Sequence, residues 1–206
     1  MRIGVYGGTF NPIHLGHTHI LGEFMARLRL DQALLIPTGI PPHKQAHALA
    51  SPQDRAAMCA LAAEEVSRER VRVSSIELER PGKSYTALTL RALREEYPGD
   101  ELYLLMGEDM FLTVDSWYEA GEIFRLAGLC ASPRSPEGLE RLLEKKRALE
   151  DLGARCFVED IPFWDISSTR VRELAARGES LKGLVPPRVA EYIREHQIYR
   201  SRRRRN

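Results

Sequence analysis

The residues with the clearest chemical potential stand near the start of the chain, in the run Gly7-Gly8-Thr9-Phe10-Asn11-Pro12-Ile13-His14-Leu15-Gly16-His17. This run separates an apolar segment at residues 3–6 from a segment at 18–28 whose apolar positions recur at helical spacing. At a strand-to-helix junction of an open α/β sheet, glycine lets a ligand approach the backbone, and the helix start offers free N–H groups and partial positive charge. Two histidines three residues apart face the same side of the opening helix. These features predict a phosphate-binding site with imidazole donors.

Other interpretations of this run have weaker support. A Gly-Gly pair is often only a tight turn. His14 and His17, with His19 as a third candidate, could form part of a zinc site, but no cysteine or acidic residue lies nearby at ligand spacing. The dinucleotide fingerprint Gly-x-Gly-x-x-Gly does not occur in this run. Gly82-Lys83-Ser84 is not a P-loop either, because that loop needs a glycine where this chain has Glu77.

A second group of polar residues lies far along the chain, in Asp165-Ile166-Ser167-Ser168-Thr169-Arg170-Val171-Arg172. Ser167 or Ser168 could cap a helix that begins near Thr169. Consecutive hydroxyls and an arginine at a helix start also suit an anion, although a simply capped helix explains this segment better when it is taken alone. With the first run, two helix starts bearing His and Arg donors would suit the two ends of a triphosphate.

The elements that must position these residues alternate between short apolar runs and longer amphipathic segments. Strands are predicted at 3–6, 33–36, 71–76, 102–106, 127–131 and 155–158, and helices at 18–28, 53–66, 85–97, 117–124, 137–152, 169–177 and 187–195. This alternation predicts an α/β fold with a mostly parallel sheet and helices on both faces. A proline-rich loop at 37–44 leaves the carboxyl end of the second strand and carries His43 and Lys44, although it could equally be an ordinary surface loop.

Composition narrows the class of protein. The formal charge of +1 over 206 residues includes five arginines in residues 200–206, so the rest of the chain carries 1 − 5 = −4. An acidic body argues against a nucleic-acid-binding surface in the fold, and a terminal arginine block is usually a solvated tail. Three cysteines far apart fit a reducing compartment, and no apolar run approaches membrane-spanning length. We expect a cytoplasmic protein with one domain over 1–199, whose C-terminal helical part spans about 166–199, and a basic tail at 200–206.

The two polar runs together resemble the signature of the HxGH nucleotidyltransferase superfamily. The first matches as Gly7-Gly8-Thr9-Phe10-x-Pro12-x-His14-x-Gly16-His17, and residues 166–172 resemble the second ATP-binding motif in the same order. Within the superfamily the chain most resembles the bacterial nicotinate-nucleotide adenylyltransferases, nearly from end to end. Landmarks of that family stand at 41–44, 84–86, 107–109, 117–118 and 192–193. Asn11 replaces the Asp of many members, but an amide still accepts a turn hydrogen bond; the tail at 200–206 lies outside the resemblance.

The resemblance implies a Rossmann-like nucleotidyltransferase fold and transfer of the adenylyl group of ATP to nicotinate mononucleotide. The implied ATP-binding residues are Gly7, Gly8, Thr9, Phe10, His14, Gly16, His17, Ser167, Ser168, Thr169 and Arg170, with His14, His17 and Arg170 as the catalytic ones. The implied acceptor-binding residues are Lys44, Thr86, Asp109, Trp117 and Tyr118. Mg²⁺ is expected on the triphosphate without protein ligands. The expected partners are the two small-molecule substrates, with no membrane and no specific nucleic acid; a homo-oligomer is left open.

Three alternatives to this function remain. A sister adenylyltransferase could use nicotinamide mononucleotide or phosphopantetheine, but the phosphopantetheine enzymes resemble a pattern with Thr at the place of His14. A nucleotide-binding regulator that has lost catalysis is disfavoured by the intact His14, His17 and Arg170. An RNA-binding module rests only on the arginine tail.

Overall fold

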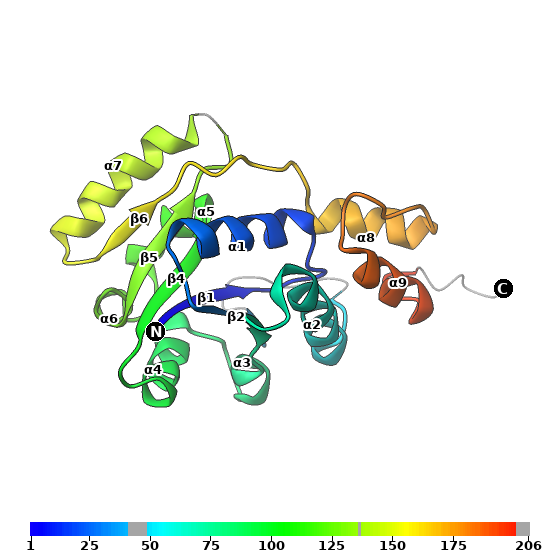
Figure 1. Ribbon diagram of the computed structural model, residues 1–206, viewed down its shortest axis with the longest axis horizontal. Helices are drawn as coiled ribbons and strands as arrows, with labels where there is room; N and C mark the ends of the chain where they lie inside the picture. Colours follow the sequence, from blue (N-terminus) through cyan, green and yellow to red (C-terminus); the bar gives the residue numbers. More distant parts are fainter. Residues whose placement is uncertain (41–48, 136, 201–206) are drawn as a thin grey trace.

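The computed structural model describes residues 1–40, 49–135 and 137–200. Within them, six strands form one sheet in the order β3-β2-β1-β4-β5-β6, and every neighbouring pair is parallel (Figure 1). The strands are β1 (Arg2–Gly8), β2 (Gln32–Pro37), β3 (Val71–Val73), β4 (Glu101–Gly107), β5 (Ala127–Ser132) and β6 (Cys156–Val158). The helices are α1 (Leu15–Arg27), α2 (Pro52–Ser67), α3 (Ile76–Glu79), α4 (Thr86–Glu96), α5 (Glu108–Phe111), the 3₁₀ turn η1 (Val114–Ser116), α6 (Ala120–Leu126), α7 (Gly138–Asp151), α8 (Ser168–Arg177) and α9 (Pro187–Glu195).

The strands alternate their side chains between two apolar cores, one on each face of the sheet. Tyr6 and Leu35 point into a core shared with α1, α2, α8 and α9. Val5 and Leu34, each one residue earlier, belong to the opposite core, which is shared with α4, α6 and α7. Because both faces are covered, the strands are apolar throughout. The predicted α/β fold with a parallel sheet and helices on both faces is confirmed.

The strand order places a topological switch point between β1 and β4. The chain builds outward from β1 to β3 and then returns to add β4 on the other side of β1. The connections that leave the two neighbouring strands therefore diverge, and a crevice opens at their carboxyl ends, where ligands bind in such sheets. Gly7 and Gly8 end β1 at this edge, and Gly107 ends β4.

The C-terminal helices α8 and α9 lie at one end of the molecule, beyond the start of α1 (Figure 1). Hydrogen bonds join them to the loop after β1: Ser168 Oγ donates to the Pro12 carbonyl at 2.9 Å, and Arg172 Nη1 donates to the Asn11 carbonyl at 2.8 Å. The Tyr199 hydroxyl donates to Asn11 Oδ1 at 2.7 Å. The hydrogen bonds to the Asn11 amide oxygen therefore come from distant segments, from Tyr199 and from the Ala50 backbone N–H at 3.0 Å, whereas a bond within the turn was expected. The C-terminal segment is a wall of the site at the edge of the sheet.

Several predicted boundaries were wrong. Helix α1 begins at Leu15 rather than residue 18, so His17 lies in its first turn. The third strand ends at Val73, and Ile76 opens α3 instead. The helix predicted at 117–124 begins only at Ala120, because Glu119 adopts the left-handed conformation with φ 52°. Within the described ranges, no helix is long and apolar enough to cross a membrane.

Candidate active site

The loop after β1 is shaped by an aromatic packing that only glycine permits. Phe10 has φ 45° and is buried, with its ring edge-on to Tyr6 and to His17 at centroid distances of 5.5 and 5.2 Å. A Cβ on Gly8 would lie 3.0 Å from the Phe10 ring, whereas a Cβ on Gly7 would meet no described atom within 4 Å. Gly8 is therefore required for packing, and Gly7 exposes backbone to open space at the end of β1.

The two histidines of the loop form a stacked pair at the start of α1. His14 is the N-cap residue, and its ring lies 3.6 Å from that of His17, centroid to centroid. The His14 backbone N–H donates to His17 Nδ1 at 3.2 Å. Because Nδ1 accepts, the neutral His17 ring carries its proton on Nε2, which is left to donate to a ligand. His14 Nδ1 is buried without a hydrogen-bond partner among the described residues, as expected where a ligand would supply one.

Both imidazoles are electrically neutral in the structure. Burial, and secondarily the charge of Arg134, lowers the pKa of His14 to about 4. Burial lowers the pKa of His17 well below its ordinary value, with further contributions from His14 and Arg134. At neutral pH each ring is therefore a neutral donor, and positive charge must come from arginines.

The start of α8 supplies a second group of donors. Ser167 caps the helix by accepting from the Arg170 backbone N–H at 3.2 Å, and Thr169 Oγ1 accepts from Arg172 Nη2 at 3.1 Å. The Ser168 hydroxyl donates its proton to Pro12, so its backbone N–H is the group left for a phosphate. The Arg170 side chain is exposed. The predicted ATP-binding residues from the two runs therefore lie together, across the joint between α1 and α8.

The amide groups of α1 are less open than the sequence suggested. The Leu15 N–H donates to the Leu184 carbonyl at 2.9 Å, and the His17 N–H turns back to the His14 carbonyl at 2.9 Å. Gly16 is tightly enclosed: a Cβ on it would lie 3.1 Å from His14 Nδ1 and 3.6 Å from the Trp164 carbonyl oxygen. The structure thus shows a close approach of Gly16 to other parts of the protein, whereas the expected approach of adenosine to Gly16 stays a prediction.

Arg134 is a candidate functional residue that the sequence interpretation missed. It follows β5, and its guanidinium would lie 3.2 Å from a Cβ on Gly107, at the carboxyl end of β4. Its Nη1 pairs with Asp109 Oδ2 at 2.7 Å, and its backbone N–H donates to Glu108 Oε2 at 2.7 Å. A cation is therefore held at the switch point. Its only sequence signal is an arginine directly after an apolar strand, in Ser132-Pro133-Arg134.

Arg55 and Arg172 are further residues of the site that were not predicted as such. Arg55 is 1% exposed and donates from Nη1 to the Thr9 carbonyl at 2.8 Å. With Arg172 on Asn11, it fixes the backbone of the loop from both sides. Cations that bond to carbonyls of a loop stabilise one loop conformation and leave the N–H groups facing a ligand.

The predicted acceptor residues fall into separate places. Thr86 opens α4, and the Tyr118 ring lies 4.6 Å from that of Tyr85, the residue before Thr86. Trp117 is half-buried, with Nε1 donating to Thr113 Oγ1 at 3.4 Å. Asp109 belongs instead with Arg134. Lys44, with the rest of 41–48, lies outside the described residues.

The geometry of the histidines does not suit a zinc ion. His14 and His17 stack face to face, and His19 lies apart, bonded through Nε2 to the Pro162 carbonyl and stacked on Trp164. Three zinc ligands must instead converge on one point. In the part of the chain that the structure describes, no group of three or more His, Cys, Asp or Glu side chains is placed to hold a metal ion.

Comparison with known proteins agrees with this geometry. Residues 5–174 match the family of cytidylyltransferase-like proteins. A probable nicotinate-nucleotide adenylyltransferase of Synechococcus sp. (strain JA-3-3Ab) is 40% identical over 96% of this chain and 94% of its own, and one of Geobacter sulfurreducens is 38% identical over 97% and 98%. The fold is that of Plasmodium falciparum nicotinic acid mononucleotide adenylyltransferase complexed with NaAD, at a TM-score of 0.78 and 19% identity over 96% and 97% of the two chains. The chain belongs to the nicotinate-nucleotide adenylyltransferase family of the cytidylyltransferase-like proteins.

Proposed function

We propose that this protein transfers the adenylyl group of ATP to nicotinate mononucleotide, giving nicotinate adenine dinucleotide and pyrophosphate. The observation that carries the proposal is the joint between the His14–His17 pair and the start of α8, held by the hydrogen bond from Ser168 to Pro12. Two groups of hydrogen-bond donors that suit phosphate, from opposite ends of the chain, meet there. A bound triphosphate needs such donors along its whole length. The family supports the same reaction.

The reaction needs positioning more than acid–base chemistry. A phosphate oxygen of the mononucleotide attacks the α-phosphorus of ATP; the new P–O bond forms as the bond to the β-phosphate oxygen breaks, and pyrophosphate leaves with that electron pair. The nucleophile is already an anion, so no protein base is required. Holding the reactants in line contributes roughly 7–11 kcal/mol, and each aimed donor about 2.7–4 kcal/mol.

The ATP-binding residues divide the triphosphate between them in this proposal. Gly7, Gly8, Thr9 and Phe10 bring backbone to the α-phosphate. His17 donates from Nε2 to the oxygens where charge develops, and His14 donates beside it. Ser167, Ser168, Thr169 and Arg170 bind the β- and γ-phosphates, while Gly16 lets adenosine approach α1. These assignments follow from the resemblance of the two runs to the family motifs, and the hydrogen bonds that join the loop after β1 to the start of α8 support them.

A divalent cation fits this site only when it is bound to the nucleotide. The neutral imidazoles of His14 and His17 offer none of the oxygen ligands that Mg²⁺ prefers. The Asp109 carboxylate nearby is already paired with Arg134. We therefore assign Mg²⁺ to the phosphate oxygens and water. When bound, it neutralises part of the triphosphate charge.

The acceptor side is proposed from the edge of the sheet beyond β4. Thr86 and the backbone at Tyr118 would bind the pyridine carboxylate, and Trp117 would stack on the ring. Lys44 would meet the mononucleotide phosphate, and Asp109 would reach a ribose or help orient the site. Arg134, held at the carboxyl end of β4, would add a cation for that phosphate.

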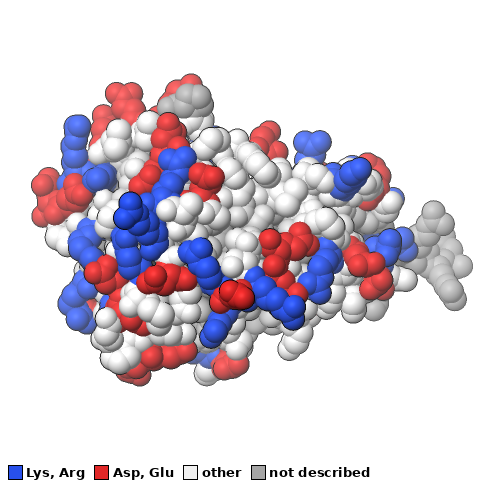
Figure 2. All heavy atoms as spheres, in the orientation of Figure 1, with Lys and Arg blue, Asp and Glu red and all other residues white. Residues whose placement is uncertain are grey.

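The remaining features fit a one-domain enzyme of small molecules. The C-terminal helices share a core with α1 and α2, which supports one domain over 1–199. Acidic and basic side chains are interspersed on the face that Figure 2 shows, and no continuous basic patch covers the described residues on that face. We propose a cytoplasmic location, no membrane or specific nucleic-acid partner, and leave a homo-oligomer open.

Pyrophosphate release tests the proposed function directly. The protein is given ATP and Mg²⁺ with nicotinate mononucleotide, nicotinamide mononucleotide or phosphopantetheine, each in a separate reaction, and ATP without acceptor is the control. The proposal expects the highest kcat/KM with nicotinate mononucleotide. A preference for either other acceptor, or no turnover with any pyridine nucleotide, would contradict it.

A further inference from the structure

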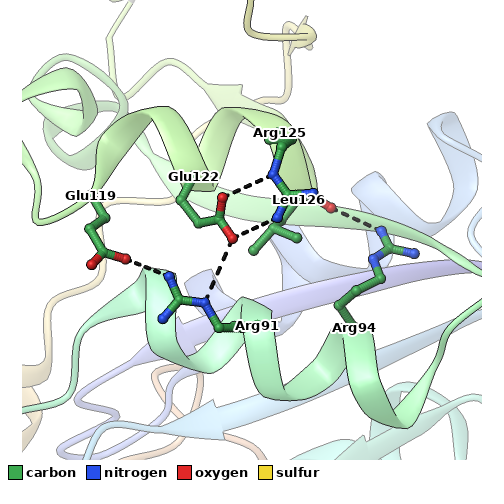
Figure 3. A network of polar contacts seen from close by, with 6 residues as sticks. All are labelled: Arg91, Arg94, Glu119, Glu122, Arg125 and Leu126. Atoms are coloured by element: carbon green, nitrogen blue, oxygen red, sulfur yellow. Dashed lines mark hydrogen bonds and ion pairs between the residues drawn. The ribbon is translucent and has the colours of Figure 1, made fainter.

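A network of charged side chains joins α4 to α6, outside the site described above (Figure 3). Arg91 of α4 lies between two carboxylates: its Nη2 is 2.6 Å from Glu119 Oε2, and its Nε is 3.6 Å from Glu122 Oε1. Arg125 binds Glu122, with two hydrogen bonds of 2.9 and 2.7 Å, and pairs with no other carboxylate among the described residues. Arg91 thus joins α4 to Glu119 and Glu122, and Arg94 makes a further link by donating from Nη2 to the Leu126 carbonyl at 3.0 Å. Of these two arginines, Arg91 is the one that pairs with Glu119.

Glu119 occupies a conformation that its surroundings must maintain. Its φ of 52° and ψ of 47° place it in the left-handed region, directly before α6. A non-glycine residue in that region costs free energy and persists where neighbouring contacts specify it. The hydroxyl of Tyr118, and after it the guanidinium of Arg91, lower the pKa of the Glu119 carboxyl, which keeps it ionised for the pair. The ion pair with Arg91 is thus one contact that holds this backbone.

The backbone that Glu119 terminates carries two of the proposed acceptor-binding residues. Trp117 and Tyr118 immediately precede it, and the Tyr118 ring packs on Tyr85, next to Thr86. One end of this turn is therefore held against the start of α4, and the other is held by Arg91, later on the same helix. Both contacts come from α4, so that helix defines where the turn lies relative to Thr86.

We infer that Arg91 is a positioning residue for the acceptor: through Glu119 it holds the Trp117–Tyr118 turn at the distance from Thr86 that a pyridine mononucleotide requires. The inference rests on the proposed function, since it concerns the acceptor side of that site. Arg91 does not itself contact the substrate. It acts through the turn, and the triphosphate side of the site does not depend on it.

A structural role for Arg91 in folding would be small and can be separated from positioning. The Arg91 and Glu119 side chains are 44% and 37% exposed, and exposed ion pairs contribute little to stability. Arg91→Gln should therefore fold and melt as the wild type does. Displacement of a binding turn, by contrast, changes substrate affinity strongly even when it is slight.

The test compares Arg91→Gln with a matched control, Arg125→Gln, which removes one arginine from the same network and leaves the Arg91–Glu119 pair intact. We expect Arg91→Gln to raise KM for nicotinate mononucleotide about fivefold, the most that an exposed ion pair contributes, while KM for ATP stays within about twofold. Arg125→Gln should change neither KM. Arg91→Lys, which keeps a cation beside Glu119 and Glu122, should recover much of the loss.

The outcomes separate this inference from the proposed function. Equal KM values in the two single variants, or an equal rise in both KM values of Arg91→Gln, would overturn the positioning role. A parallel fall in melting temperature would assign Arg91 to folding instead. Wild-type protein inactive with both pyridine mononucleotides would defeat the proposed function first, and the inference with it; activity with either mononucleotide allows the comparison to be made with that acceptor.

Discussion

His17 combines a defined tautomer with a position in the first turn of α1. Its Nδ1 is occupied by the His14 backbone N–H, so only Nε2 can donate to a phosphoryl oxygen. We expect His17→Ala to lower kcat by about 10²–10³, the usual cost of losing one aimed donor. The same change removes a ring that packs on Phe10 and His14, so it should lower the melting temperature but leave the protein folded.

The matched control for this prediction is His196→Ala. His196 is the C-cap residue of α9, where its Nδ1 contacts the Tyr192 carbonyl, and it is not one of the proposed site residues. Steady-state kinetics and thermal unfolding of both variants provide the measurement. A folded His17→Ala protein with wild-type kcat would remove His17 from the reaction.

His14 makes stability depend on pH. Its pKa is lowered to about 4 in the folded protein from an ordinary value of 6.5, with burial as the main cause. Between these values the unfolded chain binds a proton that the folded protein does not, so the free energy of unfolding falls as pH falls from about 6.5 toward 4. His14 accounts for roughly 3 kcal/mol of that fall.

A glutamine at this position isolates the contribution of His14. Urea unfolding of wild type and His14→Gln at pH 6.5, 5.5 and 4.5 measures it, since all other titrating groups are common to both proteins. The two free-energy curves should approach each other as pH falls. Parallel curves would mean that the His14 ring is not held neutral by burial.

The start of α8 depends on Arg172 as well as on its own cap. Arg172 bonds to the Asn11 carbonyl and to Thr169 Oγ1, and it thereby joins the two halves of the proposed triphosphate site. Arg172→Ala should lower the free energy of unfolding by about 1.5–3 kcal/mol, as charged hydrogen bonds do, and raise KM for ATP. Arg177→Ala, on the same helix with a surface partner in Glu179, should do neither. If both variants gave the same free energy of unfolding and the same KM for ATP, Arg172 would not join the two halves of the proposed triphosphate site.

Sequence patterns predicted those elements whose ends are set by local chemistry. Ser167 caps α8 by its own side chain, and β1 is a buried apolar run, so both were placed correctly. The start of α6 was wrong because Glu119 takes a left-handed backbone that a tertiary contact with Arg91 stabilises. Arg134 was missed because its position over Gly107 requires knowing that β4 and β5 are neighbours. Both features depend on contacts between residues far apart in the sequence, and the periodicity of a single segment does not report such contacts.

Tyr199, near the C-terminus, contacts the loop after β1. The Tyr199 hydroxyl bonds to Asn11 Oδ1, and burial raises the pKa of that hydroxyl above its ordinary value. Arginine charges follow it in residues 200–206, beyond the resemblance to the family. Within residues 1–40, 49–135 and 137–200, Tyr199 is the last residue whose hydrogen bond reaches the loop after β1.

Two truncations that differ by one residue test this boundary. Deletion of 200–206 should leave turnover and the free energy of unfolding unchanged, because Tyr199 keeps its bond to Asn11. Deletion of 199–206 removes that ring and its hydrogen bond, and should cost on the order of 2 kcal/mol of stability and raise KM for ATP by loosening the loop. Urea unfolding and ATP-dependent pyrophosphate release measure both effects. A large loss of turnover in the shorter deletion would give the arginine tail a role in catalysis, and equal behaviour of the two truncations would separate Tyr199 from the site.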